Sequence, residues 1–368
     1  MTNLNFTQLD SLFRNNNFPA IENDARGIRF LKLRSMSRSE TLEDFAREAD
    51  LNLNNIGKRD YFRFIFESRI TNEQINTYIN HKYEVERVIR RNNEDYLIDQ
   101  LNRMQSFDWG GSFGNSLEKN IVDNYVKKIQ SYQAINDEIE GALLNSLRGY
   151  TLNSWYNHWT SIIIEDIFKD HPRVFPTVGL VKKIDFFIND IPFDLKVTYF
   201  PEELLKTKLQ LRGYGNELTK LKRICRQLNI FIPSDMKDKA LKLHLFQKVD
   251  EDPRDEARAF ISNLKGHKKA IIREAEANPL ELKRWFYENQ GEARFDASNR
   301  FFLVLTDESD LSNSWRLKRN KVFLSQKINE HLNNMTMNAN DLLTEFYWAK
   351  TQETFTCLSD ILFLKYED

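Results

Sequence analysis

The chain has 368 residues, of which 41% are hydrophobic and 12% aromatic, and its formal net charge is −1. A chain of this size can bury one large core or two smaller ones, and we expect two domains. Its apolar runs are too short to cross a membrane and no signal peptide is recognisable, so we expect a cytoplasmic protein. Two cysteines are too few for a disulfide framework or a zinc site, and the six histidines show no metal-ligand spacing.

Residues 1–106 are predicted to be almost wholly helical and to form an N-terminal domain. Within them, residues 41–59 resemble a helix-turn-helix, with Ala46 where the two helices cross and Ile56 inside the second helix. The resemblance implies DNA contacts through four side chains: Asn54, Asn55, Lys58 and Arg59. The alternative is a plain helical hairpin whose apolar positions are core.

A stretch rich in glycine, serine and aromatic residues, residues 106–116, is predicted to be a loop between domains. Residues 107–368 would then form the second domain.

The second domain is predicted to include a helix that begins at Ser154 and ends before His171-Pro172, because apolar residues recur between them at helical spacing. The helix carries two adjacent carboxylates, Glu165 and Asp166. On a helical wheel Glu165 lies on the polar side and Asp166 within the apolar stripe. Both stay candidates for an unusual role, and an ordinary solvated helix charge is the alternative for either.

Residues 183–197 predict a β-hairpin with Asn189 and Asp190 in its turn, because both residue types tolerate positive φ and apolar segments flank them. A two-residue turn sets the register of the facing pairs: Ile188–Ile191, Phe187–Pro192 and Phe186–Phe193.

The same register would place Asp185 opposite Asp194 in a close pair, where like charges repel and a positive group should lie between them. Period-two alternation puts Lys196 on the face of Asp194. Mg²⁺ is usually held by one or two carboxylates plus substrate phosphate, and a nearby lysine can steer or activate a water molecule. The hairpin therefore favours a metal-dependent phosphodiesterase. A surface hairpin with a solvated charge pair is the alternative.

Asp185 followed by Asp194-Leu195-Lys196 resembles the motif of the PD-(D/E)XK nuclease superfamily, to which many type II restriction endonucleases belong. The resemblance is local and covers about residues 155–200. Ile184 stands where the family's name has proline.

The resemblance implies that Asp185 and Asp194 hold Mg²⁺ and that Lys196 positions the attacking water. A carboxylate of the preceding helix is expected to assist. Because the family more often uses glutamate there, Glu165 is the expected residue, with Asp166 as the open alternative.

Residues 181–248 carry fourteen basic and eight acidic residues, a local excess that favours attraction to phosphate although the whole chain is near neutral. A solvated face balanced by the acidic residues at 250–256 is the alternative. The mostly helical stretch at about 207–295 is predicted to be an insertion into the nuclease core.

The last elements predicted are a strand at 301–306, a helix at 314–333 and one or two strands at 354–365. With the hairpin, this order predicts an α/β (mixed α+β) fold. By resemblance it would be a restriction-endonuclease-like core with a central mixed sheet flanked by helices, plus the helical N-terminal domain.

The expected function is therefore a Mg²⁺-dependent endonuclease that hydrolyses phosphodiester bonds of double-stranded DNA, a sequence-specific type II restriction enzyme. By resemblance it would act as a homodimer on a palindromic site, with a cognate DNA methyltransferase as its genetic partner. Two alternatives stay open. One is a repair or defence nuclease acting on structured DNA or RNA, and the other is a catalytically silent nucleic-acid-binding protein.

Overall fold

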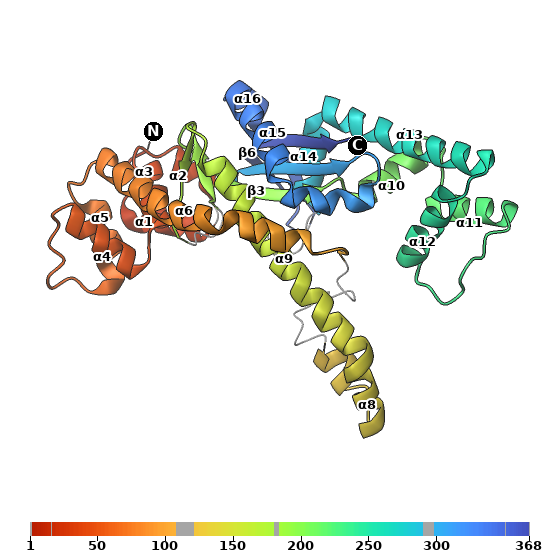
Figure 1. Cartoon of the computed structure of the whole chain (residues 1–368). Helices are drawn as coiled ribbons and strands as arrows, with labels where there is room; N and C mark the ends of the chain where they lie inside the picture. The colour runs from red at the N-terminus through yellow and green to blue at the C-terminus, as the bar shows by residue number, and fades with distance from the viewer. Residues whose placement is uncertain are drawn as a thin grey trace. The chain divides into compact units, whose positions relative to one another are not determined.

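The computed structural model describes residues 2–15, 17–107, 121–179, 184–289, 298–349 and 351–367. Within them the strands form a six-stranded sheet in the order β1-β2-β3-β4-β6-β5. The strands are β1 (Val174–Pro176), β2 (Phe186–Ile188), β3 (Ile191–Tyr199), β4 (Arg300–Asp307), β5 (Leu343–Trp348) and β6 (Glu353–Tyr366). β4 and β6 pair in parallel, whereas β1–β2, β2–β3 and β5–β6 are antiparallel. The fold is mixed α+β, with helices packed on the mixed sheet, as the sequence predicts (Figure 1).

The chain divides into two compact units. The first comprises Met1–Leu195 and Trp315–Met337, and the second comprises Lys196–Ser314 and Asn338–Asp368. The domain boundary predicted near residue 106 falls inside the first unit. Most of the loop predicted at 106–116 lies outside the described residues.

The first unit consists mainly of helices. They are α1 (Phe6–Arg14), α2 (Phe18–Glu22), α3 (Gly27–Ser35), α4 (Ser39–Glu48), α5 (Tyr61–Glu67), α6 (Asn72–Asn102), α8 (Tyr132–Glu138), α9 (Leu144–Lys169) and α15 (Lys321–Asn334). The long helix α6 begins with a capping box, in which Thr71 and Gln74 bond each other's backbone N–H groups. The start of α6 is thus fixed by neighbouring residues in the sequence.

One apolar core joins the N-terminal helices to the hairpin region. Phe30 contacts Phe62 and Phe66 at ring-centroid distances of 5.2 and 5.9 Å. Ile184 and Phe187, from the hairpin region, are buried in the same core. Residues 1–106 therefore share their interior with the hairpin.

The helix predicted to begin at Ser154 begins ten residues earlier, at Leu144. It follows directly on the π-helical turn η3 (Ile139–Leu143), which in turn follows α8, so the three segments run as one nearly continuous helix (Figure 1). Ser154 therefore lies inside a helix and not at its start. The predicted stop is confirmed, since α9 ends at Lys169.

The second helix of the predicted helix-turn-helix is not formed. Residues 51–57 are loop, with Asn55 in the left-handed conformation at φ 68°, and a 3₁₀ turn η1 (Lys58–Asp60) leads into α5. Leu51 and Ile56 still pack against the core. A loop therefore buries these two side chains as a helix would, and the prediction from apolar spacing was wrong for this reason.

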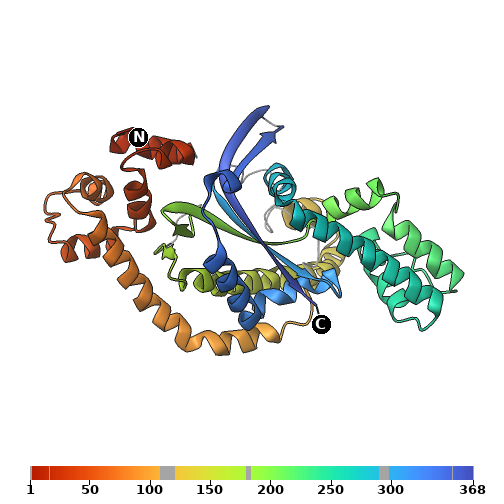
Figure 2. The same cartoon turned by 90° about the horizontal axis from the view of Figure 1, so that it is seen from above.

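Among the described residues of the second unit, five helices lie between β3 and β4. They are α10 (Glu202–Leu211), α11 (Glu217–Gln227), α12 (Asp238–Asp250), α13 (Asp255–Ala277) and α14 (Pro279–Asn289), and the short α16 (Ala339–Leu342) follows later in the chain. The mostly helical character predicted for about 207–295 is confirmed as far as residue 289; residues 290–297 lie outside the described residues. α11, α12 and α13 pack together, as the green and teal helices of Figure 2 show.

The predicted strand at 301–306 is confirmed as β4 and that at 354–365 as β6, whereas β5 was not predicted on its own. The helix predicted at 314–333 is split into a 3₁₀ helix, η4 (Leu311–Arg319), and α15. The break falls at Asn320, whose side chain accepts a hydrogen bond from the Phe323 N–H and so caps α15. In the part of the chain that the structure describes, no helix combines the length and apolarity needed to cross a membrane.

Candidate active site

The hairpin register is confirmed pair by pair. Ile188 faces Ile191, Phe187 faces Pro192 and Phe186 faces Phe193. Asn189 and Asp190 both have positive φ, 48° and 63°, as a two-residue turn of the primed type requires. The turn is also tethered to helix α3, because the Lys32 ammonium lies 2.7 Å from an Asp190 carboxylate oxygen.

Asp185 departs from the predicted register. It precedes β2, and its N–H donates to the Phe193 carbonyl at 2.8 Å, so no backbone pair with Asp194 is formed. Its Oδ2 instead accepts a hydrogen bond from the Leu195 N–H at 2.7 Å, where a strand carbonyl would otherwise bind. The Thr177 hydroxyl donates to the Asp185 carbonyl at 2.6 Å. Asp185 is therefore held at its N–H, its carbonyl and its carboxylate.

Three carboxylates lie within electrostatic reach of one another at this point. Burial, followed by the negative charges of Glu165 and Asp194, raises the pKa of Asp185 to about 7, against the opposing effects of the Leu195 hydrogen bond and the Lys169 charge. Asp194 is itself only 8% exposed. Like charges crowded in a low-dielectric environment are costly unless a cation joins them.

The two adjacent acids of α9 have separate partners. Asp166 is buried and receives two hydrogen bonds from Arg90 of α6, at 2.7 and 2.8 Å, with Arg87 3.4 Å away. Glu165 pairs with Lys169 one turn along the helix at 3.2 Å. Consecutive helical residues point about 100° apart, so only one can face the hairpin. Glu165 is the one that contributes to the field at Asp185.

Lys169 was not singled out from the sequence. The sequence feature that could have identified Lys169 is its position four residues after Glu165, because side chains at this spacing lie close together on a helix. Its side chain is 11% exposed and its charge acts on both Glu165 and Asp185. Thr177, the hydrogen-bond donor to Asp185, had no recognisable sequence signal.

Lys196 lies two residues after Asp194 on the continuous strand β3 and is half-buried. Strand geometry gives the two residues the same face. The predicted order of acid, acid and lysine along one hairpin is therefore kept, although Asp185 reaches its place through side-chain bonds and not through the ladder.

The set of possible metal ligands at the hairpin is small. Among the described residues, no group of three or more His, Cys, Asp or Glu side chains is arranged to hold a metal ion. Mg²⁺ commonly takes only one or two protein carboxylates and completes its shell with water and phosphate. Asp185 and Asp194 fit that smaller requirement, and their mutual repulsion is what a divalent cation would relieve.

The helix-turn-helix candidates are all exposed: Asn54, Asn55, Lys58 and Arg59. Asn54 and Asn55 lie in the loop that replaces the predicted second helix. Lys58 pairs with Glu43 at 3.1 Å. The four residues are accessible, but no helix presents them as a recognition surface.

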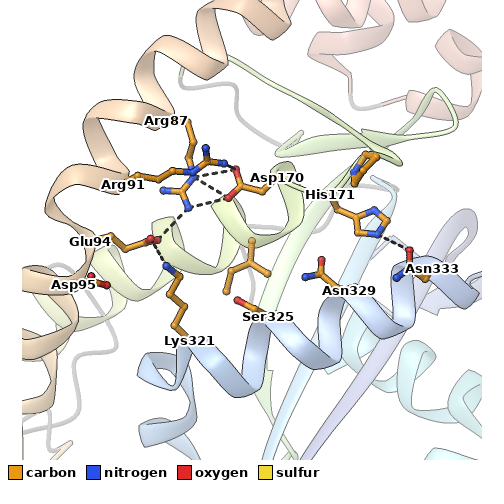
Figure 3. Close-up of a pocket in the computed structure, with 12 residues that line it drawn as sticks. Arg87, Arg91, Glu94, Asp95, Asp170, His171, Lys321, Ser325, Asn329 and Asn333 are labelled. Atoms are coloured by element: carbon orange, nitrogen blue, oxygen red, sulfur yellow. Dashed lines mark hydrogen bonds and ion pairs between the residues drawn. The ribbon is translucent and has the colours of Figure 1, made fainter.

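A polar pocket of about 690 Å³ lies elsewhere in the first unit, lined by α6, the end of α9 and α15 (Figure 3). Most of its charges are paired within the protein: Arg87 and Arg91 bind Asp170 at 2.9 and 3.0 Å, and Lys321 binds Glu94. Asp185, Asp194 and Lys196 do not line it. The pocket's ion pairs connect helices and leave the hairpin as the candidate for chemistry.

Comparison with known proteins adds no assignment: no family model, no curated protein and no solved structure matches this chain.

Proposed function

We propose that this chain is a Mg²⁺-dependent endonuclease that hydrolyses phosphodiester bonds of double-stranded DNA, built on a restriction-endonuclease-like core. The observation that carries the proposal is the group of three carboxylates, Glu165, Asp185 and Asp194, in which burial and the charges of Glu165 and Asp194 raise the pKa of Asp185. Lys196 follows Asp194 by two residues on β3. A structural hairpin has no need of buried acids that repel one another.

Asp185 and Asp194 would hold the Mg²⁺ ion, which when bound supplies positive charge that stabilises the phosphodiester's developing negative charge. Asp185 Oδ2 is oriented by the Leu195 N–H, which leaves Oδ1 for a further ligand. The Lys196 ammonium would donate a hydrogen bond to the attacking water and orient it toward phosphorus. Glu165, partly neutralised by Lys169, would accept a hydrogen bond from the same water shell.

The biological setting we propose is restriction of foreign DNA. A homodimer would match the two-fold symmetry of a palindromic site, and a DNA methyltransferase would protect the host's own copies of that site. Discrete fragments from a long DNA would support this setting. A smear, or a dependence on the shape of the substrate, would instead support a repair or defence nuclease.

The direct test is cleavage of long mixed-sequence DNA with Mg²⁺ by the wild type and by Asp194→Ala. We expect cleavage by the wild type that stops in EDTA, and a loss of about 1,000-fold in the variant, at the upper end of the range for groups that stabilise transition-state charge. Asp99→Ala removes an exposed acid of α6 and is the matched control, which should cleave like wild type. Equal activity of Asp194→Ala and wild type would show that the assignment is wrong.

A further inference from the structure

The helices α11, α12 and the start of α13 form a small folded element with its own core. Leu221, Ile224 and Cys225 of α11 pack with Leu245 of α12 and Ala257 of α13, and all five are buried. This core adjoins the one formed by β4, β6, α13 and α14, and Phe246 and Phe260 pack against both. The element is thus rigid enough to present a surface, and it belongs wholly to the second unit.

The surface of α11 carries cations that the protein does not neutralise. Arg223 and Arg226 are exposed and one helical turn apart, and Lys222 is half-buried beside them. Among the described residues, none of these three has an acidic partner. Basic side chains nearby do have one: Arg254 binds Asp252 at 2.5 Å. Between residues 220 and 237 the sequence has five basic residues and one acid.

An exposed aromatic ring follows directly on these cations. Phe231 is 80% exposed, one of the most exposed large apolar side chains described. Its neighbours Ile230 and Ile232 pack against the core of the element. The Ile230 N–H donates to the Cys225 carbonyl at 2.8 Å, after Asn229 turns the chain at φ 52°. Phe231 is therefore held outward by an anchored loop.

We infer that α11 and the loop after it form a surface that binds double-stranded DNA, with Lys222, Arg223 and Arg226 on backbone phosphates and Phe231 against sugar or base. Unpaired cations attract phosphate and release its counterions. Nucleic-acid-binding surfaces commonly combine such cations with an apolar or aromatic side chain. The inference rests on the proposed function for the identity of the ligand.

Double-stranded DNA is favoured over an acidic protein partner because few apolar side chains are exposed beside the cations. Among the described residues from Lys220 to Lys237, the exposed large apolar side chains are Phe231 and the 40% exposed Met236. A stable protein interface buries about 800 Å² per partner around an apolar centre. Phosphate contacts need no such area.

Binding can be tested apart from cleavage. Anisotropy of a labelled 30-base-pair duplex would be measured with the full chain carrying Asp194→Ala, without Mg²⁺. In that background the triple variant Lys222→Glu, Arg223→Glu, Arg226→Glu should weaken binding at least about tenfold. It should also lower the slope of log K against log salt by about 2–3, because each phosphate contact contributes about 0.9.

The matched control reverses three cations of the first unit that already have acidic partners: the exposed Arg14 and Arg63 and the half-buried Lys327. It makes the same change in net charge and should keep most of the affinity and the slope. If both triple variants lose affinity and slope equally, the α11 surface is not the binding site. Circular dichroism and thermal melting of each variant would confirm that it is folded.

Phe231→Ala gives an independent readout. We expect a several-fold loss of affinity with the salt slope unchanged, because an apolar contact releases no counterions. An unchanged affinity would show that Phe231 does not contact DNA.

A chain that binds DNA through α11 but never cleaves it would uphold this inference and refute the proposed function. If the α11 triple variant cleaves limiting DNA as fast as the wild type does, the proposed function is upheld and this inference is refuted.

Discussion

The hairpin of the first unit and the α11 surface of the second handle charge in opposite ways. At the hairpin, Asp194 is buried and Asp185 is half-buried, and burial together with neighbouring negative charges raises the pKa of Asp185 to about 7. On α11, Arg223 and Arg226 are exposed to solvent and only a turn apart. A buried charge interacts strongly with the particular charges around it. Water and salt screen an exposed charge, so one exposed cation can replace another.

In the proposed nuclease, this difference separates chemistry from binding. A catalytic carboxylate must have its orientation set by specific atoms, as the Leu195 N–H does for the Asp185 carboxylate. A phosphate-binding surface needs only enough cations in reach. Single conservative substitutions should therefore abolish activity at the hairpin, while the α11 surface should respond roughly in proportion to the charge removed.

The largest effect after loss of Asp194 is expected at Lys196. Lys196→Ala should lower the single-turnover cleavage rate by about 100- to 1,000-fold at saturating DNA, because a hydrogen-bond donor aimed at the reacting atoms is lost. DNA affinity, measured without Mg²⁺, should change little. Lys206→Ala on α10 removes an exposed lysine and serves as the control. A large loss of DNA affinity with an unchanged cleavage rate would show that Lys196 binds DNA and does not act in the chemical step.

The neighbouring acids of α9 offer a test within one helix. Glu165→Gln should slow cleavage by about 10- to 100-fold with little change in stability, since proton-transfer and water-positioning groups contribute on this scale or above it. Asp166→Asn should leave the rate nearly unchanged but lower the free energy of unfolding by on the order of 3 kcal/mol, because Arg87 and Arg90 lose a buried partner.

Chemical denaturation and single-turnover kinetics would separate the two effects. If Asp166→Asn, while still folded, lost more activity than Glu165→Gln, then Asp166 would be the helix acid after all.

The smallest effect concerns stability and pH. Because the pKa of Asp185 is raised in the folded state, folding takes up a proton between about pH 4 and 7, and stability falls as pH rises through that range. Without metal, Asp185→Asn should therefore be more stable than wild type at pH 8, by on the order of 1 kcal/mol, with a smaller difference at pH 5.

Thermal melting at both pH values measures the effect. Added Mg²⁺ should stabilise wild type at pH 8 and leave Asp185→Asn almost unchanged. A variant that is less stable than wild type at pH 8 would mean that the carboxylates do not repel one another.

The sequence predicted what is local. The hairpin register followed from the turn residues Asn189 and Asp190 and from apolar alternation, and the structure confirms it. The position of Asp185 did not follow, because it depends on Thr177 and Leu195, which a strand pattern does not connect. The choice between Glu165 and Asp166 needed the arginines of α6.

The failed helix-turn-helix has a similar cause. Leu51 and Ile56 have helical spacing, but they reach the core from a loop that contains a left-handed Asn55. Periodicity reports which side chains are buried and says less about the backbone that carries them.

The shared core of the N-terminal helices and the hairpin bears on how such a protein can evolve or be engineered. Ile184 and Phe187 are buried among phenylalanines of α3 and α5, and Lys32 ties α3 to the hairpin turn. The helices before α6 are therefore not an exchangeable module. A chain trimmed to begin at α6 should expose the apolar back of the hairpin and aggregate. In the proposed nuclease, DNA affinity should change more readily through substitutions in α11 and its loop, whose core does not include the hairpin.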